Sequence, residues 1–250
     1  MKTVGILGGM GPQATVLLMQ KIIAATPARD DSDHVPLLVD QNTQVPSRLR
    51  HLLDHAGDDP GPVLAAMAVR LQAAGADALA MPCNTAHHYL PAICRATTVP
   101  FLDMVALSVT HAAGLLGQSG IVGILASPAV RRTGLFDGPF AHRGMTPVYA
   151  KDEDATLAAI RSLKAKGAND GARACLTAAS ADLLAQGASV QMIACTEFSL
   201  IPEAIAKGVI AFDTLDLLVQ AIIAFATQPG KSQKRATQNS PEFRAISPIP

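Results

Sequence analysis

A short pattern that occurs twice is the feature that most constrains the fold of this chain. The apolar segment Val-Gly-Ile-Leu at residues 4–7 recurs at residues 122–125. A second set has identical spacing in the two halves: Leu71, Gly75, Ala76 and Cys83 in the first, and Leu183, Gly187, Ala188 and Cys195 in the second. In each half a helix ends at glycine, a buried strand follows, and a cysteine ends that strand. The pattern indicates an internal duplication with one cysteine in each half.

Strands that alternate with helices along the chain predict parallel sheets with helices on both faces. We therefore expect an α/β protein of two similar parallel-sheet domains related by a pseudo-twofold duplication. Residues 1–102 plus about 209–227 would form the first domain, and residues 103–208 the second. Because functional groups of open α/β sheets lie at the carboxyl ends of strands, Cys83 and Cys195 should meet in an active-site cleft between the domains.

Composition excludes several classes of protein. The chain has 20 Lys plus Arg and 20 Asp plus Glu, so its net charge of +0 gives no case for nucleic acid or a membrane surface as partner. No apolar run is long enough for a membrane span, and the N-terminus lacks a signal-peptide pattern. Four cysteines without a CxxC pair are too sparse for a disulfide scaffold, so we expect a cytoplasmic protein with reduced thiols. Residues 228–250 show little periodicity and are expected to form a disordered tail.

The two strand-ending cysteines are candidate catalytic groups. A cysteine before a helix N-terminus lies near free N–H groups and the positive end of the helix dipole, which favours the thiolate. We therefore expect Cys83 and Cys195 to be the most reactive thiols. A free cysteine is more often a small core residue, but matching positions in two halves favour catalysis for this pair. Cys94 and Cys175 are expected to be structural, since Cys175 lies on an apolar helical stripe.

Polar neighbours of the cysteines allow two interpretations. Asn84, Thr85 and Thr196 are either helix caps or ligands of a substrate carboxylate, and the two roles are compatible. His87 suggests a Cys–His hydrolase, but a histidine four residues along a helix normally lies behind the cysteine, so we expect a structural role. Arg48 is either a solvated loop cation or part of an anion site.

The glycine-rich turn after the first strand offers a rival chemistry. Residues 9–14 match G-x-G-x-x-A, and Asp40 ends the next strand, as in dinucleotide-binding folds. A single match of this kind is weak evidence and leaves the duplicated cysteines unexplained. We interpret the turn as a loop that closely approaches a small substrate.

Taken together, four segments resemble the aspartate/glutamate racemase superfamily, and most closely its aspartate racemase branch. They are residues 5–12, residues 42–48, the run Met81-Pro82-Cys83-Asn84-Thr85-Ala86-His87, and Cys195-Thr196-Glu197. The similarity extends in order over roughly residues 1 to 225. Glutamate racemases carry Asp-Ser near the first turn and His after the second Cys-Thr. This chain has Gly9-Met10 and Glu197 there, which favours the aspartate branch.

The resemblance implies a racemase that uses no cofactor and no metal. It would interconvert L- and D-aspartate by two-base proton transfer between Cys83 and Cys195, and its range could extend to other acidic or to a broader set of amino acids. The implied substrate contacts are Met10, Gln44, Arg48, Asn84, Thr85, Lys164, Thr196 and Glu197. Lys166 competes with Lys164 for the pocket, and we favour Lys164. We expect the small amino acid as the only ligand, and a homodimer.

One departure from the family bears on side-chain specificity. Residues 126–130 read Ala-Ser-Pro-Ala-Val where the family commonly has Ala-Thr-x-Gly-Thr, a segment that often lines the substrate pocket. Sister activities, such as hydantoin racemisation or arylmalonate-type decarboxylation, would keep the fold and one or both cysteines. A nicotinamide-dependent enzyme or a non-catalytic amino-acid-binding protein are less favoured alternatives.

Overall fold

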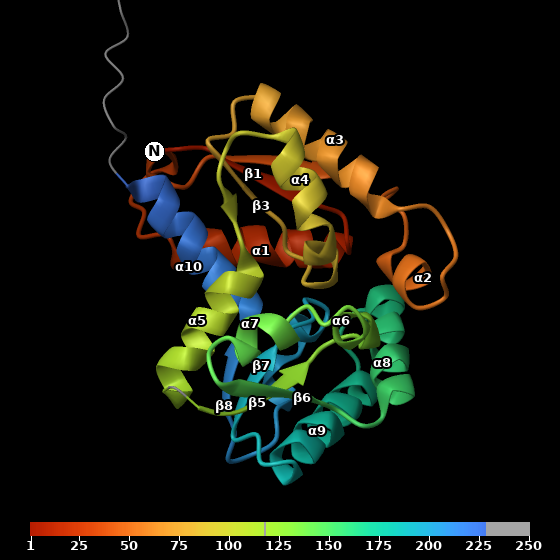
Figure 1. Ribbon diagram of the computed structural model, residues 1–250. Coiled ribbons are helices and arrows are strands. Elements are labelled where there is room, and N and C mark those ends of the chain that lie inside the picture. The colour runs from red at the N-terminus through yellow and green to blue at the C-terminus, as the bar shows by residue number, and fades with distance from the viewer. Residues whose placement is uncertain (118, 229–250) are drawn as a thin grey trace, which may run out of the picture.

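Two four-stranded parallel sheets form the framework of the protein, which is described by a computed structural model over residues 1–117 and 119–228. The strand orders are β2-β1-β3-β4 and β6-β5-β7-β8, which is the same order in each half. Figure 1 shows the two halves one above the other. The strands are β1 (Val4–Gly8), β2 (Leu37–Gln41), β3 (Ala78–Ala80), β4 (Phe101–Leu102), β5 (Gly120–Leu125), β6 (Met145–Tyr149), β7 (Val190–Ile193) and β8 (Ile210–Asp213). The predicted α/β fold of two similar parallel-sheet halves is confirmed.

Helices cover both faces of each sheet. They are α1 (Pro12–Ala25), α2 (Arg48–Leu52), α3 (Pro60–Ala73), α4 (Leu90–Ala96), α5 (Met104–Leu116), α6 (Pro128–Arg132), α7 (Asp137–Ala141), α8 (Glu153–Lys166), α9 (Asp170–Ala185) and α10 (Thr214–Thr227). Short 3-10 helices are η1 (Asp31–Asp33), η2 (Thr85–Tyr89), η3 (Phe198–Leu200) and η4 (Pro202–Ala204). None of the helices within the described residues is long and apolar enough to cross a membrane.

The central strands are buried on both faces, as expected for parallel sheets. Successive side chains of β1 alternate: Ile6 packs with α1 and α10, whereas Leu7 packs with α3 and α4. In the second half, Ile124 of β5 packs on the α5 side and Leu125 on the side of α8 and α9. Each sheet therefore has a core on both faces, and its loops at the carboxyl ends of the strands are free to form a site.

The duplicated sequence pattern corresponds to one packing arrangement built twice. A Cβ atom at Gly5 would lie 2.9 Å from Ala76 Cβ and 3.1 Å from Leu71 Cβ. At Gly123 it would meet Leu183 at 3.1 Å and Ala188 at 3.2 Å, and both are counterparts named in the sequence repeat. In each half the glycine lets the central strand approach the helix that precedes the cysteine strand.

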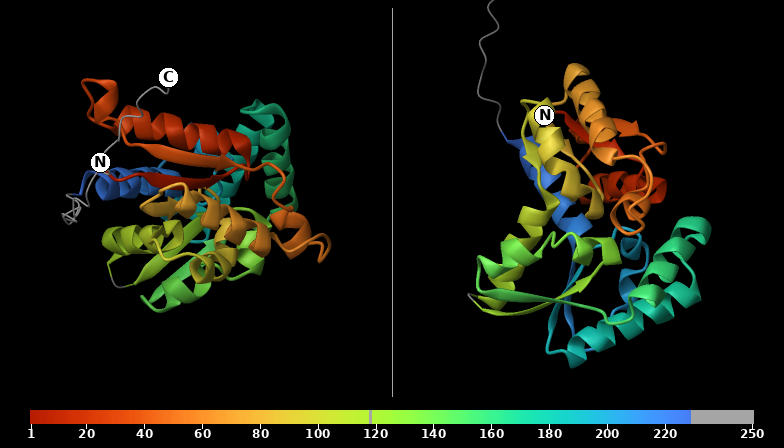
Figure 2. Two further views of the ribbon diagram at one scale, coloured as in Figure 1. Left: turned by 90° about the horizontal axis from the view of Figure 1, so that it is seen from above. Right: turned by 45° about the vertical axis from the view of Figure 1, so that its right-hand side comes forward.

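Helix α10 returns the chain to the first half, but later than predicted. We expected the return near residue 209, yet β8 pairs in parallel with β7 and completes the second sheet. Only α10 crosses back, packing against α1 and α5 (Figures 1 and 2). Its apolar face supplies Leu215, Leu218 and Ile222 to the first core, and burying that face explains why the helix leaves the second half. The tail predicted at 228–250 lies, beyond residue 228, outside the described residues.

Replacing Gly5 by alanine should destabilise the protein, because the added methyl group would overlap Ala76 in a well-packed core. We expect a loss of about 1–3 kcal/mol in the free energy of unfolding, measured by urea denaturation. Gly114 in α5 is the matched control, since a Cβ there meets no atom within 4 Å. Gly114→Ala should leave stability unchanged or raise it by about 0.5 kcal/mol. Equal stability of both variants would contradict the close packing described for Gly5.

Candidate active site

The two cysteines lie just beyond the carboxyl ends of equivalent strands. Cys83 follows β3 and Cys195 follows β7, each beside the central strand of its sheet. Both are free thiols and both are buried, with 8% and 7% of their surface exposed. The hydroxyl of Thr196 donates to the carbonyl oxygen of Pro82 across 3.1 Å. Since Thr196 follows one cysteine and Pro82 precedes the other, the two cysteine turns are in direct contact.

Side chains next to the cysteines bond across the two halves rather than capping helices. Neither η2 nor η3 has a side-chain cap, so the capping interpretation of Asn84 is wrong. Instead Asn84 Nδ2 donates to Thr214 Oγ1 at 3.0 Å, and Thr85 Oγ1 lies 3.1 Å from Ser127 Oγ. Together with the contact made by Thr196, these hydrogen bonds hold the first cysteine turn against residues that follow β5, β7 and β8 of the second sheet.

The glycine-rich turn lies over the second cysteine turn. Gly9 has φ +92°, and a Cβ there would lie 2.4 Å from the backbone of Asn42, so only glycine fits. A Cβ at Gly11 would lie 3.5 Å from Glu197 Oε1. The turn thus approaches the other half closely. A cavity of about 230 Å³ opens here, lined by Gly9, Gly11, Pro12, Gln13, Ala14, Thr43, Arg48, Lys164, Glu197 and Leu200.

These contacts disfavour the dinucleotide interpretation of the turn. A pyrophosphate at the N-terminus of α1 would face the carboxylate of Glu197, and two anions repel. The carboxylate of Asp40 is bound by Arg70 at 2.7 Å. The space above the turn suits a small ligand that carries positive charge toward Glu197.

Glu197 connects the second cysteine to a cation. The Cys195 thiol donates to Glu197 Oε2 at 3.1 Å, and Lys164 Nζ lies 3.4 Å from Oε1. The Glu197 side chain is 9% exposed, so these contacts are made in a largely dry environment. Of the two candidate lysines, Lys164 is the one that lines the cavity, and Lys166 is exposed.

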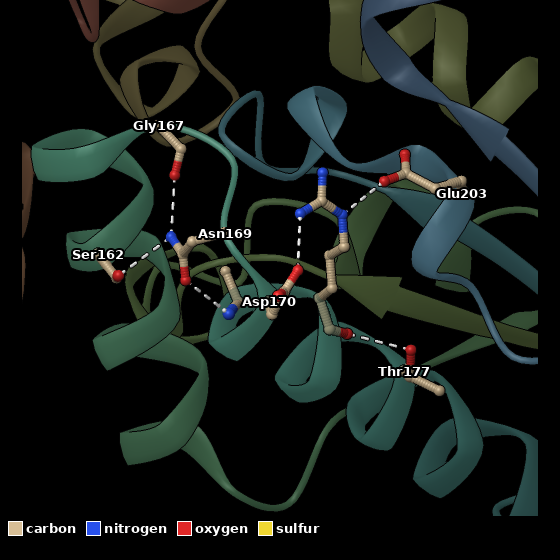
Figure 3. A network of polar contacts seen from close by, with 8 residues as sticks. Ser162, Gly167, Asn169, Asp170, Thr177 and Glu203 are labelled. Atoms are coloured by element: carbon tan, nitrogen blue, oxygen red, sulfur yellow. Dashed lines mark hydrogen bonds and ion pairs between the residues drawn. The ribbon is translucent and has the colours of Figure 1, made fainter.

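A polar network holds the end of α8 that carries Lys164 (Figure 3). Asn169 donates to Ser162 Oγ and to the carbonyl of Gly167, and its Oδ1 accepts from Ala172 N to begin α9. Arg173 then ties α9 to Glu203 at 2.8 Å. These bonds hold the connection between α8 and α9 in place, which restricts the position of the Lys164 backbone at the end of α8.

Arg48 reaches the cavity from the first half. It begins α2, whose N-cap Ser47 accepts from Arg50 N, and its guanidinium donates to the carbonyls of Val45 and Pro46 at 3.1 and 2.8 Å. These bonds leave other guanidinium N–H groups for a ligand. Two predicted contacts lie elsewhere: Gln44 is exposed and bonds its neighbours, with Thr43 lining the cavity in its place. Met10 is buried in the hydrophobic core of the first half and does not line the cavity.

The expectation of two readily ionised thiols is wrong. Burial raises the pKa of Cys83 above its ordinary value, and the attraction of Arg48 opposes this only in part. Burial and the adjacent Glu197 carboxylate raise the pKa of Cys195 still further. The helices after the cysteines are short 3-10 helices of five residues in η2 and three in η3, so few peptide dipoles are aligned to offset the lost hydration.

His87 has the structural role that its spacing predicts. Its Nδ1 bonds the carbonyl of Cys83 at 2.8 Å, and its Nε2 accepts from the backbone N–H of Met104 at 3.3 Å. Burial lowers its pKa, so the ring is neutral, and it holds the cysteine turn to the start of α5. Ser199 in the second half is its counterpart, because it bonds Asp213 at the start of α10.

Sequence reasoning placed Ser127 only within the segment 126–130, where it assigned the residue no role of its own, and it missed Thr214. Ser127 follows β5 where Gly9 follows β1, so aligning the two copies of the repeat could have found it. Thr214 begins α10 and had no signal beyond its position after a strand. Among residues 1–117 and 119–228 there is no group of three or more His, Cys, Asp or Glu side chains arranged to hold a metal ion.

The order of alkylation tests this description. A raised pKa leaves little thiolate near neutral pH, so iodoacetamide should modify the exposed Cys94 first and Cys83 and Cys195 slowly, as followed by peptide mass spectrometry. Their labelling should accelerate only above the ordinary thiol pKa of about 8.5. Glu197→Gln removes a negative charge and should speed labelling, most of all at Cys195.

The control is Glu203→Gln, which removes an exposed carboxylate paired with Arg173 and away from the site. It should change neither labelling rate. Labelling of Cys83 and Cys195 before Cys94 at neutral pH would contradict the buried, protonated thiols described here.

Comparison with known proteins identifies the family of this chain. The model of the Asp/Glu/hydantoin racemase family matches residues 7–222. The broad specificity amino-acid racemase RacX of Bacillus subtilis is 34% identical over 106 residues, which is 41% of this chain and 45% of that relative. The matched segment thus spans less than half of RacX.

Solved structures share the fold at low sequence identity. An aspartate racemase of Picrophilus torridus has a TM-score of 0.76 at 24% identity, covering 90% of this chain and 94% of its own. An aspartate racemase homologue of Pyrococcus horikoshii has a TM-score of 0.69 at 20% identity, and the match covers 91% of this chain and 100% of that one. A glutamate racemase of Francisella tularensis has a TM-score of 0.63 at 15% identity, and the match covers 90% of this chain and 80% of that one. On the family match over most of its length, the chain belongs to the Asp/Glu/hydantoin racemase family.

Proposed function

We propose that this family member is a cofactor-independent amino-acid racemase whose preferred substrate is aspartate. The observation that carries the proposal is the pair of buried thiols at equivalent strand ends, joined by the bond from Thr196 to Pro82. A binding protein needs a cleft but not two like thiols from two like halves. The neighbouring cavity, with Arg48 and Lys164 in its wall, has a suitable charge for an acidic side chain.

Racemisation by this pair needs one thiolate and one thiol. The thiolate takes the α-proton from one face of the substrate, the electron pair stays on the α-carbon, and the opposite thiol delivers its proton to the other face. The two sulfurs have then exchanged roles, so the next turnover of the product runs in reverse. The substrate ammonium brings a positive charge into the dry site, which lowers the cost of forming the thiolate.

The two thiols are expected to differ at rest. Cys195 donates to Glu197, which favours its thiol form, while the charge that acts most strongly on Cys83 is the cation of Arg48. We propose that Cys83 is the thiolate when the enzyme is ready to react. It would then be the base for the enantiomer whose α-proton faces it, with Cys195 as the acid. Since enantiomers have equal free energies in water, kcat/KM must be the same in both directions. A difference between the two thiols can therefore change kcat and KM between the two directions, but only by the same factor.

The polar groups of the site suggest how the substrate lies. The pair Thr85 and Ser127 has two hydroxyl protons and forms one mutual bond, so one proton is left to donate to the α-carboxylate. Arg48 and Lys164 would bind the distal carboxylate, and Glu197 orients Cys195. Because Lys164 is already paired with Glu197, Arg48 is the cation with more capacity for a substrate anion.

A broader range of amino acids is the second candidate. It is favoured by the similarity to RacX, which is named as a broad-specificity racemase. The first experiment is therefore a chiral assay of all proteinogenic amino acids with reduced enzyme. A hydantoin or a malonate derivative belongs in the same panel, because turnover of one of these alone would replace the amino-acid racemase assignment. A homodimer stays a prediction that light scattering checks.

Isotope incorporation tests the two-base mechanism. In heavy water, L-aspartate should give D-aspartate that carries deuterium at the α-carbon, while the remaining L-aspartate stays mostly unlabelled early in the reaction. Cys83→Ala and Cys195→Ala should each lower racemisation by about a thousandfold or more, since each thiol is the base in one direction and the acid in the other. Chiral chromatography with mass spectrometry measures both quantities.

Cys94→Ala is the matched control, as it removes an exposed thiol far from any proposed role. It should leave racemisation unchanged. Near-normal activity of Cys83→Ala, or early labelling of both enantiomer pools, would show that the paired-thiol mechanism is wrong.

Substitution of Arg48 tests the side-chain specificity. Arg48→Ala should lower kcat/KM for aspartate by about 30- to 1000-fold, equivalent to about 2–4 kcal/mol for a charge-assisted contact, and should affect alanine much less. Arg50→Ala, an exposed arginine on the same helix, is the control and should affect neither substrate. Equal losses for aspartate and alanine would mean that Arg48 supports the loop through Val45 and Pro46 but does not bind the distal carboxylate.

A further inference from the structure

The side-chain amide of Asn84 has its orientation determined by a chain of hydrogen bonds. The carbonyl oxygen of Ile193 can only accept, so the Thr214 hydroxyl, 3.0 Å away, must donate to it. That hydroxyl has no second proton, so its bond with Asn84 at 3.0 Å requires Asn84 to be the donor through Nδ2. The amide oxygen Oδ1 is therefore the free end, and the amide cannot be reversed without losing a bond.

The free oxygen is buried without a partner. Asn84 is 2% exposed, and its Oδ1 accepts no hydrogen bond from any described residue. A buried amide oxygen in this state is costly, and proteins rarely keep one unless a ligand or water satisfies it. Asn84 directly follows Cys83, so the unsatisfied acceptor belongs to the turn that carries one thiol.

Neighbouring groups of the site are also acceptors. The single hydroxyl proton of Thr196 is committed to the Pro82 carbonyl, which leaves its oxygen only lone pairs to offer. Glu197 Oε1 is buried, with an ion pair to Lys164 but no hydrogen bond. These groups suit a ligand portion that carries several N–H donors. An α-ammonium group has three donors, whereas an α-carboxylate has none.

We propose that Thr214 is a positioning residue that presents Asn84 Oδ1 as an acceptor for the α-ammonium group of the substrate. The proposal rests on the proposed racemase function for the identity of the ligand. It separates the two ends of the amino acid: the ammonium toward the acceptors that follow the cysteines, and the carboxylate toward the Thr85–Ser127 hydroxyl pair. An analogue of aspartate that lacks the amino group at its α-carbon loses the first set of bonds and keeps the second.

Thr214→Val and Thr214→Ser test the proposal. Valine keeps the size but removes the hydroxyl, so Asn84 loses its anchor and the amide is free to reverse. Serine keeps the hydroxyl and should behave like the wild type. The ligands are racemic aspartate, which shows no net turnover, and succinate, which lacks the ammonium group. Dissociation constants come from calorimetry, KM and kcat from the chiral assay, and thermal melting checks the fold.

The expected result is a selective loss. Thr214→Val should weaken the binding of aspartate by about tenfold or more and the binding of succinate by less than about twofold. In the racemase assay, KM should rise by a larger factor than kcat falls. Asn84→Ala should show the same selectivity, and combining both substitutions should add little to the effect of Asn84→Ala alone. Asn84→Ala also serves as the test if Thr214→Val does not fold.

Two outcomes would overturn the proposal. Equal weakening of aspartate and succinate by Thr214→Val and Asn84→Ala would show that these residues do not recognise the ammonium group. A serine variant as impaired as the valine variant would show that the methyl group and its packing matter rather than the hydroxyl. Either result leaves racemisation by the wild type intact. A wild type that is inactive on every amino acid would instead refute the proposed function. In that case the dissociation constants of aspartate and succinate can still be compared between the variants.

Discussion

The contact between the two cysteine turns is the interaction on which the candidate site depends. The thiols lie at the ends of two separate sheets, and the bond from Thr196 to the carbonyl of Pro82 joins their turns directly. Both sulfurs are buried, and the loss of hydration raises the pKa of each thiol. The candidate site therefore combines direct contact between the two turns with burial of both thiols. A racemase site built this way would rely on substrate charge to form its thiolate.

Duplication supplies two like thiols, but their surroundings are not alike. Glu197 follows the second cysteine at the position where Thr85 follows the first. Glu197 accepts from its own cysteine and pairs with Lys164, while Thr85 bonds Ser127 across the halves. The pseudo-symmetry thus places the two cysteines at equivalent positions, and the difference between Glu197 and Thr85 distinguishes the two thiols.

Several residues that position the site lie far from one another in the sequence. Lys164 depends on the network at the start of α9, and Arg48 on the short helix α2. Asn84 depends on Thr214, which begins the helix that crosses back to the first half. The crossing of α10 therefore does more than complete a core: it brings a hydroxyl group beneath the first cysteine turn. This couples the packing of the two halves to the polarity of the site.

By itself the sequence determined the architecture and the paired cysteines, because both follow from local periodicity and a repeated spacing. Gly5 and Gly123, Gly75 and Gly187, and the two cysteines have the positions that the repeat predicted. Only the tertiary structure decided the place of β8, the raised pKa of both thiols, the preference for Lys164 over Lys166 in the cavity wall, and the roles of Ser127 and Thr214. These depend on burial and on bonds between residues as much as 130 positions apart, which no local pattern encodes.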